Sequence, residues 1–385
     1  MYADRTILNP VMGKIKEEFS LDNAQLGLVS SVFFFSYALM QIPSGVMGDK
    51  IGRKLVLVPG YLLFGLCTAF SGLAKNFPTF LAARIMVGVG EGTYYGPQYA
   101  LSSESIPVKY RSLGTAIINS GMAFGMALGL IGSSYLTLEW GLPWQTPFYF
   151  FAIPTILVAL AIWFCIKEHP LQSDSGASGA SQTDKASKAT VGSLFKNKNL
   201  IIAYIAVFCS LYGFFMVLTW LPYYLLTERG IQGSQVGNIA SLTAWASIPG
   251  AILFSLISDK LGRRKPLVFL LVPVAAISIC GMVYIQDINL LIAALIFYGF
   301  FGKLALDPVL IAFVADNAPK ESYSSAYGVY NFVGMSSSII APYLTGYLAD
   351  KTGSLAAGFY VAAGLLLVVA LVMCFATEKP REART

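Results

Sequence analysis

The chain has 385 residues, of which 56% are hydrophobic and 12% are charged, about half the charged share of an average soluble protein. This composition excludes an ordinary soluble domain and favours helices that face lipid on several sides. The formal net charge is +6. Its basic residues lie in loops beside apolar runs, so it requires no nucleic-acid partner.

Apolar runs of about 20 residues recur along the chain, and each is long enough to cross a bilayer as a helix. The first, near residues 2–19, is short, so we expect helix 1 to be truncated at its N-terminus. The other expected spans are residues 24–48, 55–73, 77–101, 112–136, 146–166, 200–227, 234–258, 266–285, 289–314, 322–348 and 355–376. The sequence therefore predicts an all-α polytopic membrane protein with twelve transmembrane helices.

The longest polar stretch, residues 167–199, is rich in Ser, Ala, Gly, Thr and Lys, which is typical of a flexible linker. We expect it to join a six-helix bundle at residues 1–166 to a second bundle at 200–376, followed by a tail at 377–385. Basic residues gather in alternate connections, including the linker and the tail. The positive-inside rule therefore predicts that the linker and the C-terminus are cytoplasmic, in a multi-pass protein of the cell membrane.

The two predicted bundles carry related sequences. The segment GVMGDKIGRK around Asp49 recurs as SLISDKLGRRK around Asp259, 210 residues later. Asn119 and Asn331 form another pair, 212 residues apart. Pairs at a common spacing indicate an internal duplication, as in secondary transporters whose site lies between the repeats.

These paired loops resemble the signature of the major facilitator superfamily, and the resemblance covers essentially the whole chain. It implies two six-helix bundles that rock about a central cavity, with acids and bases of the loops forming a cytoplasmic gate. The matching positions are Asp49, Arg53, Lys54, Glu104, Arg111, Asp259 and Arg263. For the individual basic residues, a tight turn that merely obeys the positive-inside rule is the alternative.

Six charged residues lie inside the expected spans and away from the span ends. Insertion scales put the cost of a charge at the bilayer centre at ~2.5–3.5 kcal/mol, so such residues need a partner, water or a function. They are Asp4 and Arg5 in helix 1, Arg84 and Glu91 in helix 4, and Lys303 and Asp307 in helix 10. Arg84 and Glu91 share a helical face but lie roughly 10 Å apart, so we expect each to pair with helix 1 or with a ligand.

The chemistry of these groups suggests different roles. Arg5 is the better anion contact, because a guanidinium stays charged and can bind a carboxylate through two N–H groups. Glu91 is the better proton carrier, because a low dielectric favours the neutral form of a carboxyl group. Lys303 and Asp307 are four residues apart and can neutralise each other, or Lys303 can be a second basic contact to the substrate.

The pattern YADR in helix 1, RIMVGVGEG in helix 4 and INSG in helix 5 resembles the anion:cation symporter family, which includes transporters of galactonate, hexuronates and sialic acid. The resemblance implies that Arg5 contacts the substrate carboxylate and that Asp4 and Glu91 take part in proton coupling, with Arg84 near Glu91. The junction SSESIPVKYRS lacks the Trp-Phe-Pro of that family. YADR with GVGE is also similar to the Spinster-type lysolipid carriers.

Further polar and aromatic residues inside the spans are candidate substrate contacts. They are Tyr37, Gln41, Tyr94, Gln98, Asn119, Tyr212, Trp245 and Asn331. The asparagines can bind substrate hydroxyls or hold helices together. The five cysteines lie singly in apolar spans, and His169 is the one histidine. We therefore expect no metal, no cofactor and no enzymatic activity.

The sequence as a whole predicts a proton-coupled symporter for a small organic anion, either a sugar acid or another hydroxylated carboxylate. We expect it to work by alternating access, as a monomer in the lipid bilayer. Two alternatives remain. One is a lysolipid or drug carrier of the same fold, and the other is a transporter-like sensor that binds its ligand without net flux.

Overall fold

The computed structural model describes residues 1–94, 97–98, 111–165, 195–318 and 323–378, without the side chains of 49, 111–120, 259 and 323–325. Every regular element in these ranges is a helix, which confirms the predicted all-α class. Nine of the helices described are long and apolar enough to cross a membrane. The fold agrees with a twelve-helix arrangement.

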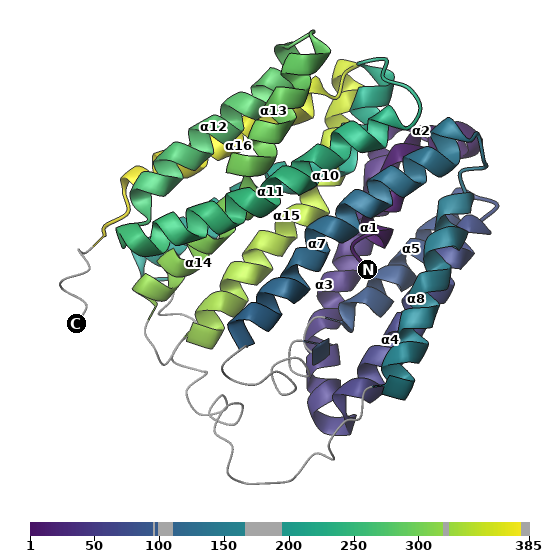
Figure 1. Cartoon of the computed structure of the whole chain (residues 1–385), viewed down its shortest axis with the longest axis horizontal. Helices are drawn as coiled ribbons and strands as arrows, with labels where there is room; N and C mark the ends of the chain where they lie inside the picture. Colours follow the sequence, from purple (N-terminus) through teal and green to yellow (C-terminus); the bar gives the residue numbers. More distant parts are fainter. Residues whose placement is uncertain (95–96, 99–110, 166–194, 319–322, 379–385) are drawn as a thin grey trace. The chain divides into compact units, whose positions relative to one another are not determined.

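The helices of the N-terminal half surround a short first segment (Figure 1). In chain order they are α1 (Asp4–Ile7), η1 (Asn9–Val11), α2 (Met12–Phe19), α3 (Asn23–Ile51), α4 (Arg53–Gly72), α5 (Phe77–Gly92), α7 (Arg111–Ser134), η3 (Tyr135–Glu139) and α8 (Thr146–Cys165). Asp22 begins α3 with a capping box, in which its side chain accepts from the amide of Gln25. Such caps satisfy amides that a helix start leaves without partners.

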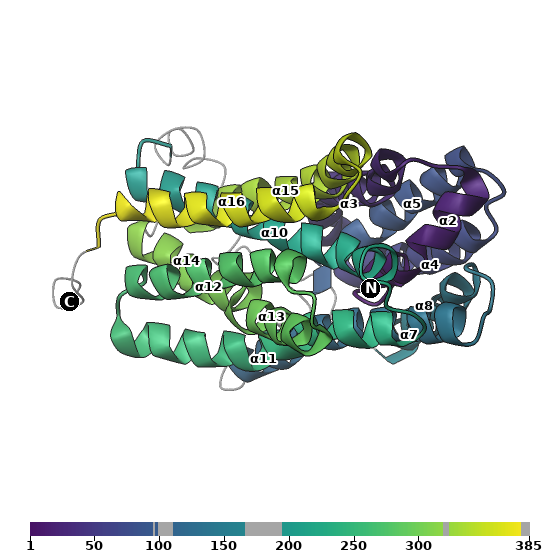
Figure 2. The same ribbon diagram turned by 90° about the horizontal axis from the view of Figure 1, so that it is seen from above.

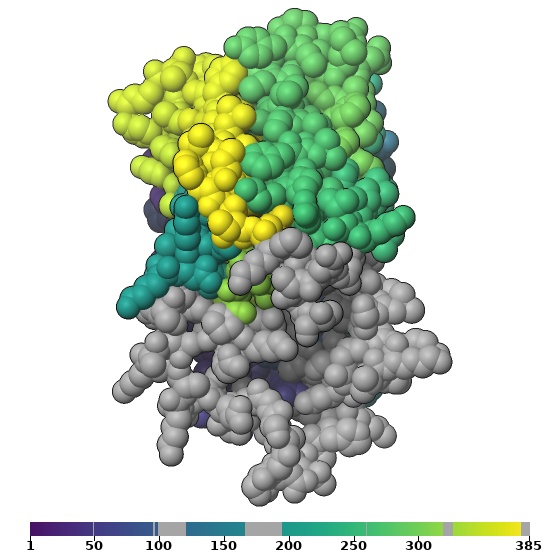
Figure 3. Space-filling model, turned by 90° about the vertical axis from the view of Figure 1, so that its left-hand side faces the viewer, coloured from purple at the N-terminus to yellow at the C-terminus, as the bar shows by residue number. Residues whose placement is uncertain are grey.

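The C-terminal half follows the same plan. Its helices are α10 (Lys198–Thr227), α11 (Gln235–Leu261), α12 (Lys265–Tyr284), α13 (Ile288–Phe301), α14 (Lys303–Asn317), α15 (Tyr323–Thr352) and α16 (Ala356–Cys374). α12 packs against both α13 and α16, and Figures 2 and 3 show α12 and α16 side by side.

Two compact units emerge from the packing. Unit 1 is the N-terminal half together with Leu218–Ala244 and Pro342–Leu355; unit 2 holds the rest of the C-terminal half. The C-terminal parts of α10 and α15 and the N-terminal part of α11 thus belong with the N-terminal helices. The bundles expected at residues 1–166 and 200–376 remain a prediction, because the contacts group the chain in this different way.

Two expected helices are interrupted. The first segment bends through the 3₁₀ turn η1, where Pro10 has no amide hydrogen to continue an α-helix. The span expected at 289–314 is divided between α13 and α14 at Gly302, whose ψ is −156°. A Cβ at Gly302 would overlap the carbonyl oxygen of Tyr298, so this break requires a glycine.

The backbone repeats the duplication seen in the sequence. Six of the seven residues with positive φ in the described part of the chain form pairs, and Gly233 is the exception. The pairs are Ser20 with Gly230, Gly52 with Gly262, and Gly141 with Gly353. Subtracting their numbers gives 210, 210 and 212, the same spacing as the sequence pairs. Left-handed residues end helices, so the two halves of the chain end corresponding helices at corresponding residues.

Glycines allow α5 to pack closely against its neighbours in unit 1. α5 packs on both α3 and α4, and a Cβ at Gly88 would overlap Ser36 Oγ and the carbonyl oxygen of Phe33. A Cβ at Gly90 would lie 2.7 Å from Phe64 Cβ and from its amide nitrogen. This close approach fixes the face of α5 that points into the unit.

Replacing Gly88 with alanine is expected to destabilise the protein, because α3 backbone occupies the space of the new methyl group. Overpacking of this kind costs about 1–3 kcal/mol. Gly364→Ala in α16 is the matched control, since a Cβ there meets nothing within 4 Å. Thermal unfolding of the purified protein should therefore shift down by several degrees for Gly88→Ala and not for Gly364→Ala. Equal unfolding temperatures would contradict the packing described here.

Candidate functional site

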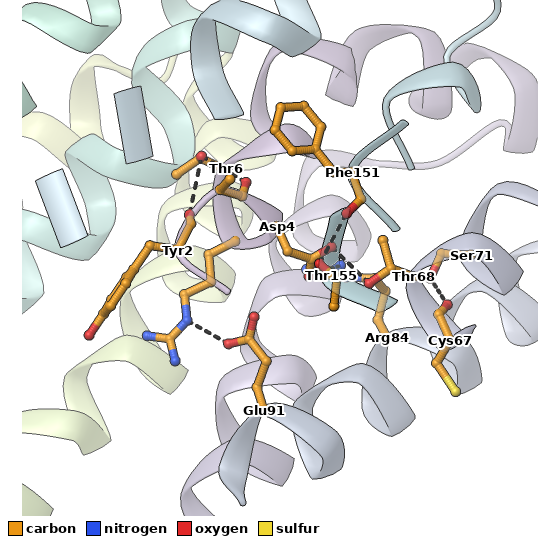
Figure 4. A network of polar contacts seen from close by, with 12 residues as sticks. Tyr2, Asp4, Thr6, Cys67, Thr68, Ser71, Arg84, Glu91, Phe151 and Thr155 are labelled. Atoms are coloured by element: carbon orange, nitrogen blue, oxygen red, sulfur yellow. Dashed lines mark hydrogen bonds and ion pairs between the residues drawn. The ribbon is translucent and has the colours of Figure 1, made fainter. Parts of the chain in front are cut away.

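The charged residues of helices 1 and 4 meet in the interior of unit 1 (Figure 4). Asp4 and Arg5 open α1, and Arg84 and Glu91 lie on the inward face of α5. All four side chains are nearly inaccessible, with exposures of 2%, 7%, 1% and 0% respectively. Four buried charges in a helical membrane protein make this cluster the candidate functional site.

The first ion pair joins Arg5 to Glu91. The Nε atom of Arg5 donates to Glu91 Oε2 at 2.7 Å. The hydrogen bond and the opposite charges offset part of the cost of burying both groups. Removing either partner would leave the other charge buried alone.

The second ion pair joins Arg84 to Asp4. Arg84 Nη1 lies 3.6 Å from Asp4 Oδ2, and the hydroxyl of Thr68 in α4 donates to Asp4 Oδ1 at 2.8 Å. Asp4 is thus held from two sides by groups of α4 and α5. The two pairs connect α1 to α5 at two levels and leave the cluster neutral overall.

Aromatic rings line the two guanidinium groups. The Cζ atom of Arg5 lies 4.4 Å from the ring centroid of Tyr37 and 4.9 Å from that of Tyr2. That of Arg84 lies 4.9 Å from the ring centroid of Phe33. Ring faces stabilise a cation by ~2 kcal/mol where water is excluded, so they help to keep both arginines charged inside the unit.

Some polar atoms of the cluster have unused bonding capacity. Among the residues that the structure describes, neither Nη2 of Arg5 nor Oε1 of Glu91 has a hydrogen-bond partner, although both are buried. An unbonded buried polar atom is costly. Arg5 Nη2 can therefore donate to an anion, and Glu91 Oε1 can accept a proton. Among these described residues, Asp4 Oδ2 and the Nε and Nη1 atoms of Arg84 are buried without a hydrogen-bond partner in the same way.

The expected pairing with helix 1 is confirmed for both Arg84 and Glu91. The carboxylate that faces Arg84 is that of Asp4, and the position of Arg84 near Glu91 that the family resemblance implied remains a prediction. Asp4 and Arg5, which are adjacent in α1, both turn toward α5. No local sequence pattern predicts this orientation.

The other contacts expected in unit 1 are less closely tied to the cluster. Tyr37 belongs to the aromatic lining. Tyr94, Gln41 and Gln98 are half-buried, and the ring of Tyr94 lies 5.9 Å from that of Tyr61. The structure leaves their expected role in substrate binding as a prediction.

Unit 2 has its own charged group beside the helix break at Gly302. Lys303 Nζ lies 2.9 Å from Asp307 Oδ2, and the hydroxyl of Tyr330 donates to Asp307 Oδ1 at 3.1 Å. Lys303 and Asp307 therefore neutralise each other in this state. Of the other residues expected to bind substrate, Tyr212 is buried, Trp245 half-buried and Asn331 exposed.

The expected cytoplasmic gate is only partly visible. Glu104 lies outside the described residues, as do the side chains of Asp49, Arg111, Asn119 and Asp259. Arg53 is half-buried, and Lys54 Nζ lies 5.1 Å from the ring centroid of Trp163.

In the second copy of the loop, Arg263 is exposed, and its neighbour makes the contacts. Arg264 Nε lies 3.2 Å from Asp316 Oδ2, and Arg264 Nη1 donates to the carbonyl oxygen of Ser258 at 2.7 Å. The gate residues expected in both loops remain a prediction.

Several contributors were not singled out by the sequence. Thr68 and Phe33 lie in apolar spans, where a hydroxyl or a ring normally signals only packing. Tyr330 and Arg264 could have been noticed, because each adjoins an expected site residue in the sequence. No group of three or more potential metal ligands occurs in the described part of the chain.

Duplicated membrane-length helices around buried ion pairs define a polytopic membrane transporter. The chain belongs to the Major Facilitator Superfamily, whose family model matches residues 1–233 and 203–385. The probable galactarate/D-glucarate transporter GudP of Bacillus subtilis is 28% identical over 383 residues, which cover 92% of this chain and 83% of that protein.

Two other similarities are informative. The hexuronate transporter of Bacillus subtilis is 26% identical over 388 residues, which cover 97% of this chain and 90% of that protein. The crystal structure of a D-xylose-proton symporter matches with a TM-score of 0.79 at 16% identity, covering 97% of this chain and 93% of that one. At this identity the structural likeness shows the fold alone.

Proposed function

We propose that this transporter is a proton-coupled symporter for a small hydroxylated organic anion, with sugar acids as the first candidates. The observation that carries the proposal is the buried bond between Arg5 and Glu91, with one unbonded polar atom on each partner. Arg5 can bind either the carboxylate of Glu91 or the carboxylate of a substrate. The same residue thus links anion binding to the charge of Glu91.

The coupling follows from this competition. When Glu91 takes a proton, its neutral carboxyl group attracts Arg5 less, and the guanidinium is free to bind a substrate carboxylate. When the substrate leaves, Arg5 returns to Glu91 and favours loss of the proton. Because coupling free energies are reciprocal, each ligand must raise the affinity for the other by the same factor.

The second ion pair supports a positioning role. Asp4 is engaged by Thr68 of α4 and by Arg84 of α5, which fixes its carboxylate between these two helices. Holding Asp4 in place also holds Arg5, its neighbour in α1. Direct participation of Asp4 in proton coupling, and of Arg84 in substrate binding, remains a prediction.

The relatives support the substrate class. Galactarate and D-glucarate, named for one relative, are hydroxylated dicarboxylates, and the hexuronates named for another are hydroxylated monocarboxylates. We propose Lys303 as a second basic contact, and Tyr212, Trp245 and Asn331 as further contacts. We also propose a monomer in the cell membrane with a cytoplasmic C-terminus, on the distribution of its basic residues.

Transport by purified protein in liposomes tests the proposal. An inward proton gradient should drive accumulation of labelled glucarate, galactarate or glucuronate, and glucose should not accumulate. In detergent, the same acids should raise the unfolding temperature more at about pH 5.5 than at about pH 8, because protonation of Glu91 frees Arg5. Flux of these acids that is independent of the proton gradient would exclude symport. Stabilisation by lysophosphatidylcholine alone would favour a lipid carrier.

A further inference from the structure

Two carboxylates of unit 1 cap helices that lie far away in the sequence. At the end of α15, Asp350 accepts from the amide of Asn23 at 3.0 Å and from that of Ala24 at 2.8 Å, at the start of α3. At the end of η3, Glu139 accepts from the amide of Ser234 at 2.9 Å, just before α11. Both acids occupy the N-terminal end of a helix, where free amides and the helix dipole attract a negative charge.

The two caps are related by the internal duplication. Glu139 and Asp350 are separated by 350 minus 139, or 211 residues, and Asn23 and Ser234 by 234 minus 23, also 211. The acid of the first repeat caps a helix of the second, and the acid of the second repeat caps a helix of the first. The contacts are therefore exchanged between repeats in both directions.

The helices under these caps are in close contact. A Cβ at Gly27 in α3 would overlap the carbonyl oxygen of Pro342 in α15, and a Cβ at Gly237 in α11 would overlap that of Leu130 in α7. Here too the spacing repeats, since 237 minus 27 is 210 and 342 minus 130 is 212. These paired crossings leave no space between the helices at this end of the unit.

Other acids at the same end bond within their own repeat. Glu228, at the end of α10, accepts from the amide of Leu355 at 2.6 Å and from the hydroxyl of Ser354 at 2.7 Å. Glu18 accepts from the indole N–H of Trp144 at 2.5 Å. Glu228 and Glu18 are 210 residues apart and belong to the same duplication. Only Glu139 and Asp350 among these four acids reach across to the other repeat.

We propose that Glu139 and Asp350 form a symmetric latch that holds this end of the transporter closed. The end lies opposite the basic loops that begin α4 and α12, so the positive-inside rule assigns it to the non-cytoplasmic side. Opening to that side separates the helix pairs and breaks both caps. The inference rests on alternating access but not on the identity of the substrate.

The exposed position of both acids suits this role. When a helix cap at the surface breaks, water replaces the carboxylate as the partner of the helix amides at a small cost in free energy. The cap can therefore break and reform in every transport cycle. Two weak contacts that are related by the internal duplication bias the closed state without locking it. A single strong buried ion pair would slow the opening step.

Cysteine labelling tests the latch in the full-length chain without a substrate. Ala240, one helical turn beyond Gly237, is 1% exposed, so in Ala240→Cys the thiol is shielded while this end is closed. Intact cells are treated with a membrane-impermeant maleimide, and the labelling of the parent chain, with its native cysteines, is subtracted. We expect Glu139→Ala and Asp350→Ala each to speed labelling about two- to fivefold. The double variant should show the product of the two effects, because the caps are separate.

Glu228→Ala is the matched control, since it removes an exposed carboxylate cap at the same end that does not cross between repeats. It should leave the labelling rate unchanged. Labelling rates equal to that of the parent for both latch variants would overturn the proposal, as would an equal increase for Glu228→Ala. If thermal unfolding shows that an alanine variant is poorly folded, Glu139→Gln and Asp350→Asn replace it, because they keep the shape of the side chain and remove its charge. The same criteria apply to them.

Discussion

Glutamine at position 91 is expected to abolish proton-driven accumulation and to leave exchange of substrate intact. Glu91→Gln keeps a side-chain oxygen that can accept from Arg5 Nε, so the contact of 2.7 Å need not be lost. The amide cannot bind or release a proton, and it leaves Arg5 permanently available to an anion. The variant should therefore carry its substrate in both directions without coupling.

The size of the effect follows from the gradient. A difference of one pH unit is worth ~1.4 kcal/mol per proton, so one coupled proton supports about tenfold accumulation of a monoanion. In liposomes with such a gradient, the native chain should approach that ratio and Glu91→Gln should stay near equality. Counterflow in preloaded liposomes should proceed in both. Glu17→Gln is the control, because Glu17 is an exposed acid of α2.

Accumulation against a gradient by Glu91→Gln would show that another group carries the proton. Asp4 is then the next acid to examine, because it is the other buried carboxylate of the cluster. Loss of counterflow together with accumulation would point instead to a structural defect, which the unfolding temperature would reveal. These measurements therefore distinguish a different proton carrier from a structural defect.

The sequence predicted the constituents of the cluster because charges are rare inside apolar spans. Arg84 and Glu91 stand out for this reason, and their seven-residue spacing places them on one face of α5. The duplication was equally visible in the sequence, since the paired loops lie at a common spacing, and the residues with positive φ in the structure have the same spacing. These features depend on local sequence or on repetition, which a single chain reveals.

The pairing of the charges could not be predicted in the same way. Which of Asp4 and Arg5 faces α5 depends on the rotation of α1 about its axis, and α1 packs against α7 and α8, far away in the sequence. The break at Gly302 was missed because one glycine in an apolar span is normally tolerated. α11 crosses α13 closely just before the break, since a Cβ at Gly250 in α11 would overlap the carbonyl oxygen of Phe300, and such a tertiary contact is not visible in the local sequence.

Alanine at position 5 is expected to abolish both accumulation and exchange. Arg5→Ala removes the guanidinium that we propose binds the substrate carboxylate, and it leaves Glu91, which is fully buried, without its counter-ion. A buried carboxyl group without a partner holds its proton, so neither step of the coupling cycle remains. Arg5→Lys should retain charge but lose the forked geometry, and we expect binding to weaken about tenfold.

The comparison with Arg84 separates substrate binding from positioning. Arg84 is engaged by Asp4 and by the ring of Phe33, so Arg84→Lys should mainly lower the unfolding temperature and leave the affinity for a sugar acid nearly unchanged. Binding to both lysine variants can be measured by titration calorimetry on purified protein. Weaker binding in Arg84→Lys than in Arg5→Lys would mean that the two arginines have the opposite roles, with Arg84 holding the anion and Arg5 fixing the helices.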